Sequence, residues 1–305
     1  MQSLSGAKVL VTGPTGQVAL PVAVALAQDN EVWGIARFGN EAARARLESS
    51  GVKCVAVDFE QADFAGVPDD FDRVLNFAVA KTNDFERDLA ANAEATGLLM
   101  THCRQARAFL HCSSTAVYQP DGHHRFAETD PLGDNHRAFG FMPTYSISKI
   151  ATEAVVRTMA RELSMPTTIA RLAVPFGDNG GWPAFHLEMM IAGQPVPVHV
   201  DGPSEYNPIH EDDIIATVPK LLDVAAVPAT IVNWAGNDVV SIEDWCAELG
   251  RITGLTPSFG PTEHTIESVA IDTGKMQAVV GACAVDWRDG LRRMVEARHP
   301  ELLQQ

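Results

Sequence analysis

The strongest constraint on the fold is a β-branched run that leads directly into a glycine-rich turn and an apolar stretch. Lys8–Thr12 (KVLVT) is followed by Gly13-Pro14-Thr15-Gly16 and then by a segment rich in Ala, Val and Leu up to Ala27. This order predicts a strand, a tight turn and a helix. The spacing Gly13-x-x-Gly16-x-x-Ala19 lets the backbone approach a pyrophosphate closely at a helix N-terminus.

The same alternation of short strands and helices continues along the chain. Further strands are expected at Glu31–Ala36, Val52–Val57, Arg73–Phe77, Ala108–Cys112, Thr167–Leu172 and Ala229–Ala235. Helices are expected at Glu41–Ser49, at Asp84–Gln105 and from Tyr145 to about Leu163. This pattern predicts an α/β protein with a Rossmann-type, doubly wound parallel sheet. We expect residues 1–172 to form that domain, completed by about 206–240, with 173–205 and 241–305 forming a smaller C-terminal substrate-binding lobe.

Charge and cysteine content narrow the class of partner. The chain has 305 residues and a net charge of −16, which argues against nucleic acid or an anionic membrane as a partner. Five cysteines without a CxxC pair indicate reduced thiols and make a metal site unexpected. The N-terminus lacks a signal-peptide pattern and no apolar run reaches membrane-spanning length, so we expect a cytoplasmic protein with a small-molecule substrate.

Two groups of polar residues are placed for chemistry. Ser113-Ser114 follow the expected fifth strand, and ligands of open α/β sheets bind beyond the carboxyl ends of the strands. Tyr145 and Lys149 are four residues apart, so a helix places them on one face. A cation beside a phenol favours the phenolate and lowers its pKa. Tyr145 is therefore a candidate general acid/base, tuned by Lys149.

The ends of the second and third strands bear on the cofactor. An acidic residue after the second strand would accept from the ribose hydroxyls of NAD, whereas an arginine would meet the 2′-phosphate of NADP. Ala36 and Arg37 occupy that junction, which favours NADP, with NAD as the alternative. Asp58 and Phe59, after the third strand, are candidates for contact with the adenine.

Several of these motifs appear in an order that resembles the extended short-chain dehydrogenase/reductase family, the NAD(P)-dependent epimerase/dehydratase family. The motifs are Thr12–Ala19, Asp58-Phe59, Asn76-Phe77-Ala78, Asn92 with Thr96, Ser113–Tyr118 (SSTAVY) and Tyr145–Lys149 (YSISK). The resemblance is close over residues 7 to about 175, and it continues more loosely through Ile209–Ile214 and Ile231-Val232-Asn233.

The resemblance implies roles for individual residues. Ser114 would bind the reacting oxygen, Tyr145 would exchange the proton, and Lys149 would hold the nicotinamide ribose. Residues implied to contact or support the cofactor are Gly13, Thr15, Gly16, Gln17, Val18, Phe77, Ala78, Val79, Lys81, Asn92, Ala173 and Pro175. The implied reaction is hydride transfer between the nicotinamide and a carbinol or carbonyl carbon, without a metal. The resemblance also implies a homodimer.

Departures from the family pattern bear on the substrate. Thr115 and Ala116 stand where sugar nucleotide dehydratases have an Asp-Glu pair, and Val174 and Tyr206 replace an asparagine and an arginine common in sugar nucleotide members. Leu172–Pro219 contains no Lys or Arg but seven carboxylates, so a diphosphate would be poorly held there. We expect an uncharged substrate. The candidate substrate-binding residues are Thr115, Ala116, Val174, Phe176, Trp182, Phe185 and Tyr206.

Three functions remain open. The leading hypothesis is an NADP-preferring reductase or dehydrogenase that acts on an uncharged carbonyl or alcohol. The second is an epimerase, acting on a sugar or sugar nucleotide, that oxidises and re-reduces its substrate with retained cofactor. The third is a non-catalytic cofactor-sensing regulator, which the presence of both Tyr145 and Lys149 disfavours.

Overall fold

A central parallel sheet forms from the strands that the sequence pattern predicts. A computed structural model describes residues 4–304. Its main sheet contains β1 (Lys8–Thr12), β2 (Glu31–Ala36), β3 (Lys53–Ala56), β4 (Arg73–Asn76), β5 (Ala108–Ser114), β7 (Thr167–Leu172) and β13 (Thr230–Trp234). Across the described residues these strands pair in the order β13-β7-β5-β4-β1-β2-β3.

The register of this sheet reflects its burial on both faces. β1 pairs in parallel with β2 and β4, with Thr12 opposite both Ile35 and Asn76. β2 pairs in parallel with β3, and β4 with β5. All six residues of β7 are buried, as expected for a central strand covered by helices. The predicted α/β doubly wound fold is confirmed.

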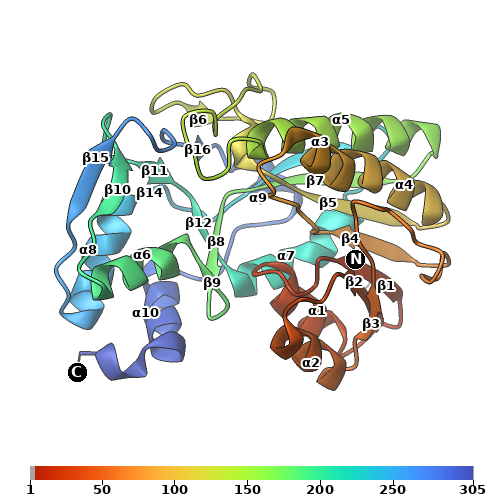
Figure 1. The fold of residues 1–305 in the computed structure, drawn as a ribbon, viewed down its shortest axis with the longest axis horizontal. Coiled ribbons are helices and arrows are strands. Elements are labelled where there is room, and N and C mark those ends of the chain that lie inside the picture. Colours follow the sequence, from red (N-terminus) through yellow and green to blue (C-terminus); the bar gives the residue numbers. More distant parts are fainter. Residues whose placement is uncertain (1–3, 305) are drawn as a thin grey trace. The chain divides into compact units, whose positions relative to one another are not determined.

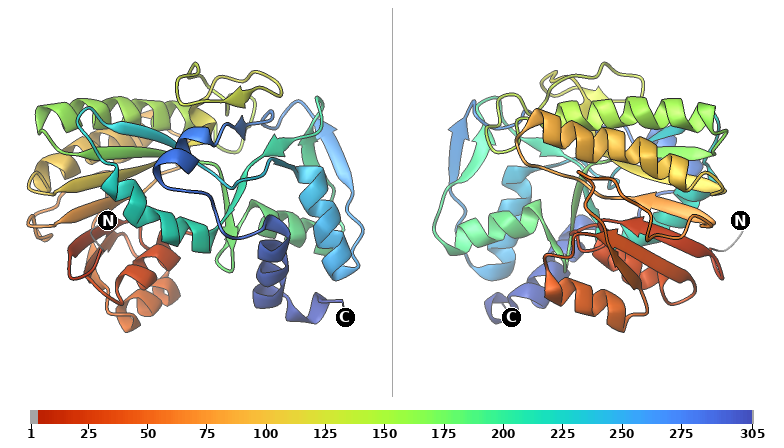
Figure 2. Two further views of the ribbon diagram at one scale, coloured as in Figure 1. Left: turned by 180° about the vertical axis from the view of Figure 1, so that it is seen from behind. Right: turned by 45° about the vertical axis from the view of Figure 1, so that its right-hand side comes forward.

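Helices cover the two faces of this sheet (Figure 1). They are α1 (Ala19–Leu26), α2 (Glu41–Ser49), α3 (Phe85–Leu89), α4 (Ala95–His102), α5 (Tyr145–Glu162) and α7 (Glu211–Asp223). Helices α3, α4 and α5 lie on one face, and α1 and α2 lie on the other (Figures 1 and 2).

The expected long helix 84–105 is interrupted by a π-helical turn at Ala90–Glu94. The Asn92 side chain donates to the Asp88 carbonyl at 2.7 Å, so it occupies an acceptor that a continuous α-helix would use. A side chain inserted in the helical ladder accounts for such a local change of pitch.

The chain separates into two compact units. The first comprises residues 1–114, 144–171 and 215–232, and the second comprises 115–143, 172–214 and 233–305. The sequence-based division placed 115–143 in the Rossmann domain, whereas their contacts group them with the second unit. Residues 206–214 likewise group with the second unit.

The second unit contains short strands and four further helices within residues 4–304. Its strands are β6 (Arg125–Phe126), β8 (Val174–Gly177), β9 (Gly180–Gly181), β10 (Val196–His199), β11 (Glu205–Tyr206), β12 (Pro208–His210), β14 (Val240–Ser241), β15 (Phe259–Thr262) and β16 (Ala270–Ile271). Its helices are α6 (Trp182–Ile191), α8 (Ile242–Thr253), α9 (Gly274–Val279) and α10 (Trp287–Arg298), with 3₁₀ turns at Thr115–Val117 and Pro300–Leu302.

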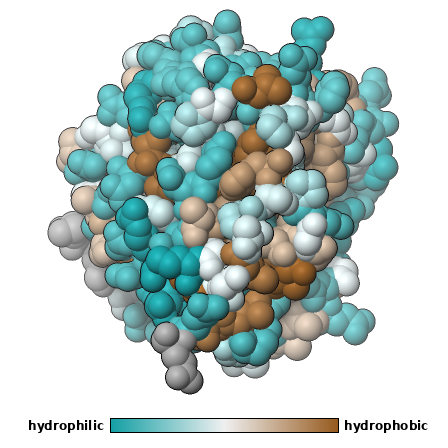
Figure 3. All heavy atoms as spheres, turned by 90° about the vertical axis from the view of Figure 1, so that its left-hand side faces the viewer, coloured by the Kyte–Doolittle hydropathy of each residue, from teal (hydrophilic) through white to brown (hydrophobic). Residues whose placement is uncertain are grey.

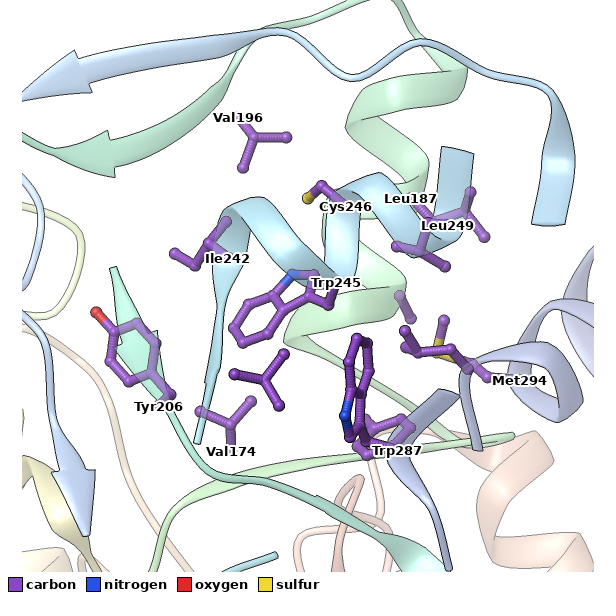
Figure 4. Packing of buried hydrophobic residues seen from close by; sticks show 14 of the residues in the cluster. Val174, Leu187, Val196, Tyr206, Ile242, Trp245, Cys246, Leu249, Trp287 and Met294 are labelled. Atoms are coloured by element: carbon purple, nitrogen blue, oxygen red, sulfur yellow. The ribbon is translucent and has the colours of Figure 1, made fainter. Parts of the chain in front are cut away.

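An aromatic and aliphatic core holds this second unit together (Figure 4). Trp245 is fully buried, and its Nε1 donates to His186 Nδ1 at 3.0 Å. Its helix α8 is capped by Ser241, whose hydroxyl accepts from the Asp244 amide at 2.9 Å. Burial of this cluster's apolar area is the main stabilising contribution to the unit.

The surface is mostly hydrophilic on the face shown in Figure 3, where apolar residues form separate groups. None of the helices in the described chain is both long and apolar enough to span a membrane.

Candidate active site

The turn after β1 has the backbone geometry that its glycines predict. Gly13 adopts φ +61°, and its amide donates to the Ile35 carbonyl at 2.9 Å. A Cβ at Gly13 would lie 2.9 Å from the Ala78 Cα, so any side chain would force the β1 and β4 loops apart. The Gly16 amide closes the turn by donating to the Gly13 carbonyl at 2.9 Å. Glycine is therefore required at position 13 by both conformation and space.

A cavity of about 250 Å³ opens over this turn. Ten residues predicted to bind the cofactor line it: Gly13, Thr15, Gly16, Ala36, Arg37, Asp58, Phe59, Phe77, Ala78 and Val79. The sequence reading missed Phe38, Gly39, Glu60, Ala80 and Ala91, which also line it. Phe38, Glu60 and Ala80 each directly follow a predicted residue, and Gly39 follows Phe38, so extending the motifs by one or two residues would have found these four.

The remaining predicted cofactor residues lie outside the lining. They are Gln17, Val18, Lys81, Asn92, Tyr145, Lys149, Ala173 and Pro175. The cavity and the glycine turn that lines it nevertheless fit the pyrophosphate and adenosine portion of a dinucleotide.

A buried polar network supports the cavity from below. The Ala78 amide donates to Thr12 Oγ1 at 2.9 Å, and that hydroxyl donates to Asn76 Oδ1 at 2.7 Å. Asn76 Nδ2 donates to Thr96 Oγ1 at 3.0 Å and lies 3.2 Å from His111 Nδ1. Burial holds the pKa of His111 well below its usual range, so the imidazole is neutral.

Asn92 fixes the loop after β4 from the π-helical turn. Its Oδ1 accepts from the Ala80 amide at 2.8 Å, and its Nδ2 donates to the Ala80 carbonyl at 3.0 Å. Asn92 thus pairs both backbone groups of one loop residue, and its effect on the cavity is through this loop.

The three residues expected to carry catalysis come together in the first unit. Ser114 ends β5, while Tyr145 begins α5 and Lys149 follows one turn later. The Ser114 and Tyr145 hydroxyls are hydrogen-bonded to each other. Lys149 is buried, and its Nζ donates to the Cys112 carbonyl at 2.8 Å and lies 5.9 Å from the centre of the Tyr145 ring.

The expectation that Lys149 lowers the Tyr145 pKa requires correction. Burial raises the pKa of Tyr145 above its usual value, and the opposing effects come from Lys81 and the hydrogen bond with Ser114. Lys81 Nζ lies 5.1 Å from the centre of the Tyr145 ring, nearer than Lys149. Burial also lowers the pKa of Lys149, because the Cys112 carbonyl is a neutral partner. The phenol is therefore protonated at neutral pH in this state.

A buried ion pair lies on the next turn of α5. Glu153 accepts from Arg171 of β7 through both carboxylate oxygens, at 3.0 and 2.8 Å, and from the Ser113 hydroxyl at 2.6 Å. These contacts connect α5, which carries Tyr145 and Lys149, to two neighbouring strands: β5, which ends in Ser114, and β7.

The seven residues predicted to bind substrate all belong to the second unit. Five are buried: Thr115, Ala116, Val174, Phe176 and Tyr206. Phe176 packs edge-on against His210, and the Tyr206 hydroxyl donates to the Glu267 carbonyl at 2.9 Å. Trp182 is partly buried, and Phe185 is 59% exposed. The buried aromatic residues serve the core, because their surfaces are already covered.

The strand order and the glycine turn under an open cavity define the Rossmann-type α/β proteins of the extended short-chain dehydrogenase/reductase class. The chain also matches the model of the NAD dependent epimerase/dehydratase family over residues 9–233. It belongs to that family.

Solved structures with the same fold include several sugar nucleotide enzymes. UDP-glucuronic acid 4-epimerase from Bacillus cereus, in complex with UDP-glucuronic acid and NAD, superposes with a TM-score of 0.82 at 20% identity, covering 95% of this chain and 98% of that one. DesIV, a dTDP-glucose 4,6-dehydratase from Streptomyces venezuelae with NAD bound, gives 0.82 at 20% identity over 96% and 97%.

UDP-N-acetylglucosamine 4-epimerase from Methanobrevibacter ruminantium gives a TM-score of 0.83 at 16% identity over 97% and 99%. At these identities the similarity concerns the fold. No protein with a curated description matches the sequence.

Proposed function

We propose that the protein is an NADP-preferring oxidoreductase that transfers hydride between the nicotinamide and an uncharged carbonyl or alcohol. The observation that carries this proposal is the contact between Ser114 and Tyr145 hydroxyls beside two lysines, in the unit that contains the cofactor cavity. When bound, the nicotinamide supplies the hydride donor or acceptor.

Each residue of this group has a separate task in the proposed reaction. The Ser114 hydroxyl binds the substrate oxygen and orients it toward Tyr145. Tyr145 is protonated, so it can donate its proton to the oxygen of a carbonyl as that oxygen gains charge. Lys149 would hold the ribose, while the positive charge of Lys81 favours the phenolate that remains after proton transfer.

The preference for NADP rests on the junction after β2. Arg37 is exposed and lines the cavity, and Ala36 provides no carboxylate for ribose hydroxyls. Arg44, whose guanidinium lies 5.2 Å from the ring of Phe38, a neighbouring lining residue, is paired with Glu48. Arg37 is therefore the cation that suits a 2′-phosphate.

An uncharged substrate is favoured by the absence of Lys and Arg from residues 172–219. The acidic residues of the same segment do not favour a cationic substrate, because most of them are paired within the structure. Six of the seven already have structural partners: Glu188, Asp201, Glu205, Glu211, Asp212 and Asp213. We propose that the second unit binds the substrate, with Trp182 and Phe185 as the aromatic contacts left accessible.

Turnover tests this function directly. Purified protein with NADPH and a panel of uncharged aldehydes and ketones should show substrate-dependent loss of absorbance at the nicotinamide band. Tyr145→Phe should lower kcat by at least about 100-fold, the typical contribution of a positioned acid, while NADPH binding is retained. Unchanged turnover in Tyr145→Phe would contradict the proposed role of Tyr145, whereas NADPH binding without any detectable turnover in the wild-type protein would indicate a cofactor-binding regulator.

The epimerase alternative gives a different result in the same assay. An epimerase with retained cofactor would interconvert a sugar or sugar nucleotide without net consumption of added NADPH. Formation of a stereoisomer without net turnover of the nicotinamide would therefore support the epimerase hypothesis and contradict the reductase hypothesis.

We also propose a homodimer, as the resemblance implied. The resemblance implies that the helices beginning near Asp84 and at Tyr145 form the interface, and Leu98 on α4 and Ile147 on α5 are exposed apolar residues on these helices. Light scattering of the native protein measures its oligomeric state.

A further inference from the structure

Asp88 is a completely buried carboxylate with four hydrogen-bond donors around it. Its Oδ1 accepts from the amide and the hydroxyl of Thr82, both at 2.8 Å. Its Oδ2 accepts from the Asn83 amide at 3.2 Å and from the Thr144 hydroxyl at 2.6 Å. Asp88 on α3 therefore connects the loop after β4 with the residue immediately before Tyr145.

The loop that Asp88 holds carries Lys81. Asn92 pairs with both backbone groups of Ala80 on one side of Lys81, and Asp88 binds Thr82 and Asn83 on the other. Asn83 has φ +65°, a left-handed conformation that needs support from its surroundings. Lys81 itself is exposed, so its position depends on the backbone on either side of it.

We propose that Asp88 is a positioning residue that holds the Lys81 ammonium over the Tyr145 ring by tying the Lys81 loop to Thr144. The inference deepens the proposed function, because it concerns the group expected to exchange the proton. Thr144 is the N-cap residue of α5, so the tie fixes the start of the helix and the loop together.

The positioning role of Asp88 and the direct effect of its charge would shift the Tyr145 pKa in opposite directions, so the two can be distinguished. Burial raises the pKa of Asp88, but hydrogen bonds from Thr144, Thr82 and Asn83 outweigh burial and hold it below its usual range. Asp88 is therefore an anion at neutral pH. A nearby anion raises a phenol pKa, so removal of its charge alone would lower the Tyr145 pKa. Loss of the Lys81 position would raise it. The other groups facing Tyr145 are Lys149, Ser114 and the Cys112 thiol.

Tyrosine titration by NMR measures the effect without substrate or cofactor. The chain contains three tyrosines, and Tyr145→Phe identifies the Tyr145 signal in a sample labelled at tyrosine Cζ. Lys81→Met should raise the titration midpoint of Tyr145, and Asp88→Asn should raise it in the same direction. In the Lys81→Met background, Asp88→Asn should produce no further rise, because the two residues act through one contact.

Controls distinguish positioning from a general loss of structure. Asp84→Asn removes the same charge from the same segment, but the Asp84 carboxylate accepts from the Arg87 amide at the exposed start of α3, so the Tyr145 midpoint should not change. Thr144→Val removes only the link to the helix and should raise the midpoint, which provides a test if Asp88→Asn does not fold.

An unchanged or lower Tyr145 midpoint in foldable Asp88→Asn or Thr144→Val protein would overturn the proposal. A rise in the Tyr145 midpoint when Asp88→Asn is added to Lys81→Met protein would also overturn the proposal. Failure of the proposed function is separate, since it would show as unchanged turnover in Tyr145→Phe whatever the titration gives.

Discussion

Glu153 of α5 and Arg171 of β7 form a bidentate ion pair whose side chains are 2% and 3% exposed. The pair is one helical turn from Lys149, and it also receives the Ser113 hydroxyl. Because both charges are removed from water, each depends on the other for its solvation.

Replacement of Glu153 should therefore be strongly destabilising. Glu153→Gln leaves the Arg171 guanidinium buried without a counter-charge, and we expect a loss of about 3–5 kcal/mol in the free energy of unfolding. Urea denaturation measures it. Glu48→Gln, which breaks the exposed Arg44–Glu48 pair, is the matched control and should stay within about 0.5 kcal/mol of wild type. Equal effects of the two substitutions would contradict the importance of burial.

Gly13→Ala should impair cofactor binding more than any other single methyl addition at the turn. The new Cβ meets the Ala78 backbone at 2.9 Å, and φ +61° is unfavourable for alanine. We expect at least about a tenfold rise in the Kd for the nucleotide, equivalent to 1.4 kcal/mol. Titration calorimetry is the measurement. Gly66→Ala adds a methyl group where no atom lies within 4 Å and should leave the Kd unchanged.

Arg37 should govern the choice between coenzymes. Arg37→Ala removes the cation that lines the cavity after β2, and the Kd for NADP should rise by about tenfold or more while that for NAD changes little. Fluorescence titration with both nucleotides gives the ratio. Arg46→Ala, on the exposed part of α2, removes an equal charge away from the lining and tests for a general field effect. An unaltered NADP/NAD ratio in Arg37→Ala would argue against the NADP preference.

The end of α10 should be sensitive to pH. His299 Nε2 lies 2.9 Å from Glu188 Oε1, and this contact raises the pKa of His299 and lowers that of Glu188. Because the pKa of His299 is raised in the folded protein, protonated His299 adds stability at low pH, and this stability is lost as the pH rises through the folded-state pKa of His299. Because the pKa of Glu188 is lowered in the folded protein, ionised Glu188 adds stability at pH values above its unfolded-state pKa. This stability is lost as the pH falls through the folded-state pKa of Glu188.

The contact is therefore strongest between these limits, in mildly acidic solution. Once the intrinsic pH dependence of amide exchange is divided out, the protection of the last turn of α10 against hydrogen exchange should be greatest there and should fall above neutral pH. In His299→Gln this pH dependence should disappear. His264→Gln, at an exposed site, should retain it.

Much of the first unit follows from local sequence. The bounds of β1 and β7 agree with the predicted strands, because short β-branched runs between turn residues leave little choice of register. β5 extends two residues further than predicted, so Ser113 and Ser114 end the strand instead of following it. The glycine turn and most of the cavity lining were predicted because the motif itself specifies a backbone shape.

Other features depend on contacts between distant residues. Lys81 and Tyr145 are 64 positions apart, and the loop that brings them together is set by the carboxylate of Asp88 and the amide of Asn92. No periodicity in the sequence encodes that arrangement. Spacing alone selected Lys149 as the partner of Tyr145, and it could not show that the Lys149 ammonium is bound to the Cys112 carbonyl. Burial of Phe176 and Tyr206 was likewise a property of the assembled core.

The division of the chain also affects how the protein is made. The polypeptide passes between the two units five times, at 114/115, 143/144, 171/172, 214/215 and 232/233. During synthesis the N-terminal glycine turn leaves the ribosome early, but the sheet that supports it lacks β7 until residue 172 and β13 until residue 234. The nascent chain therefore exposes an incomplete, aggregation-prone sheet edge until most of its length has been translated.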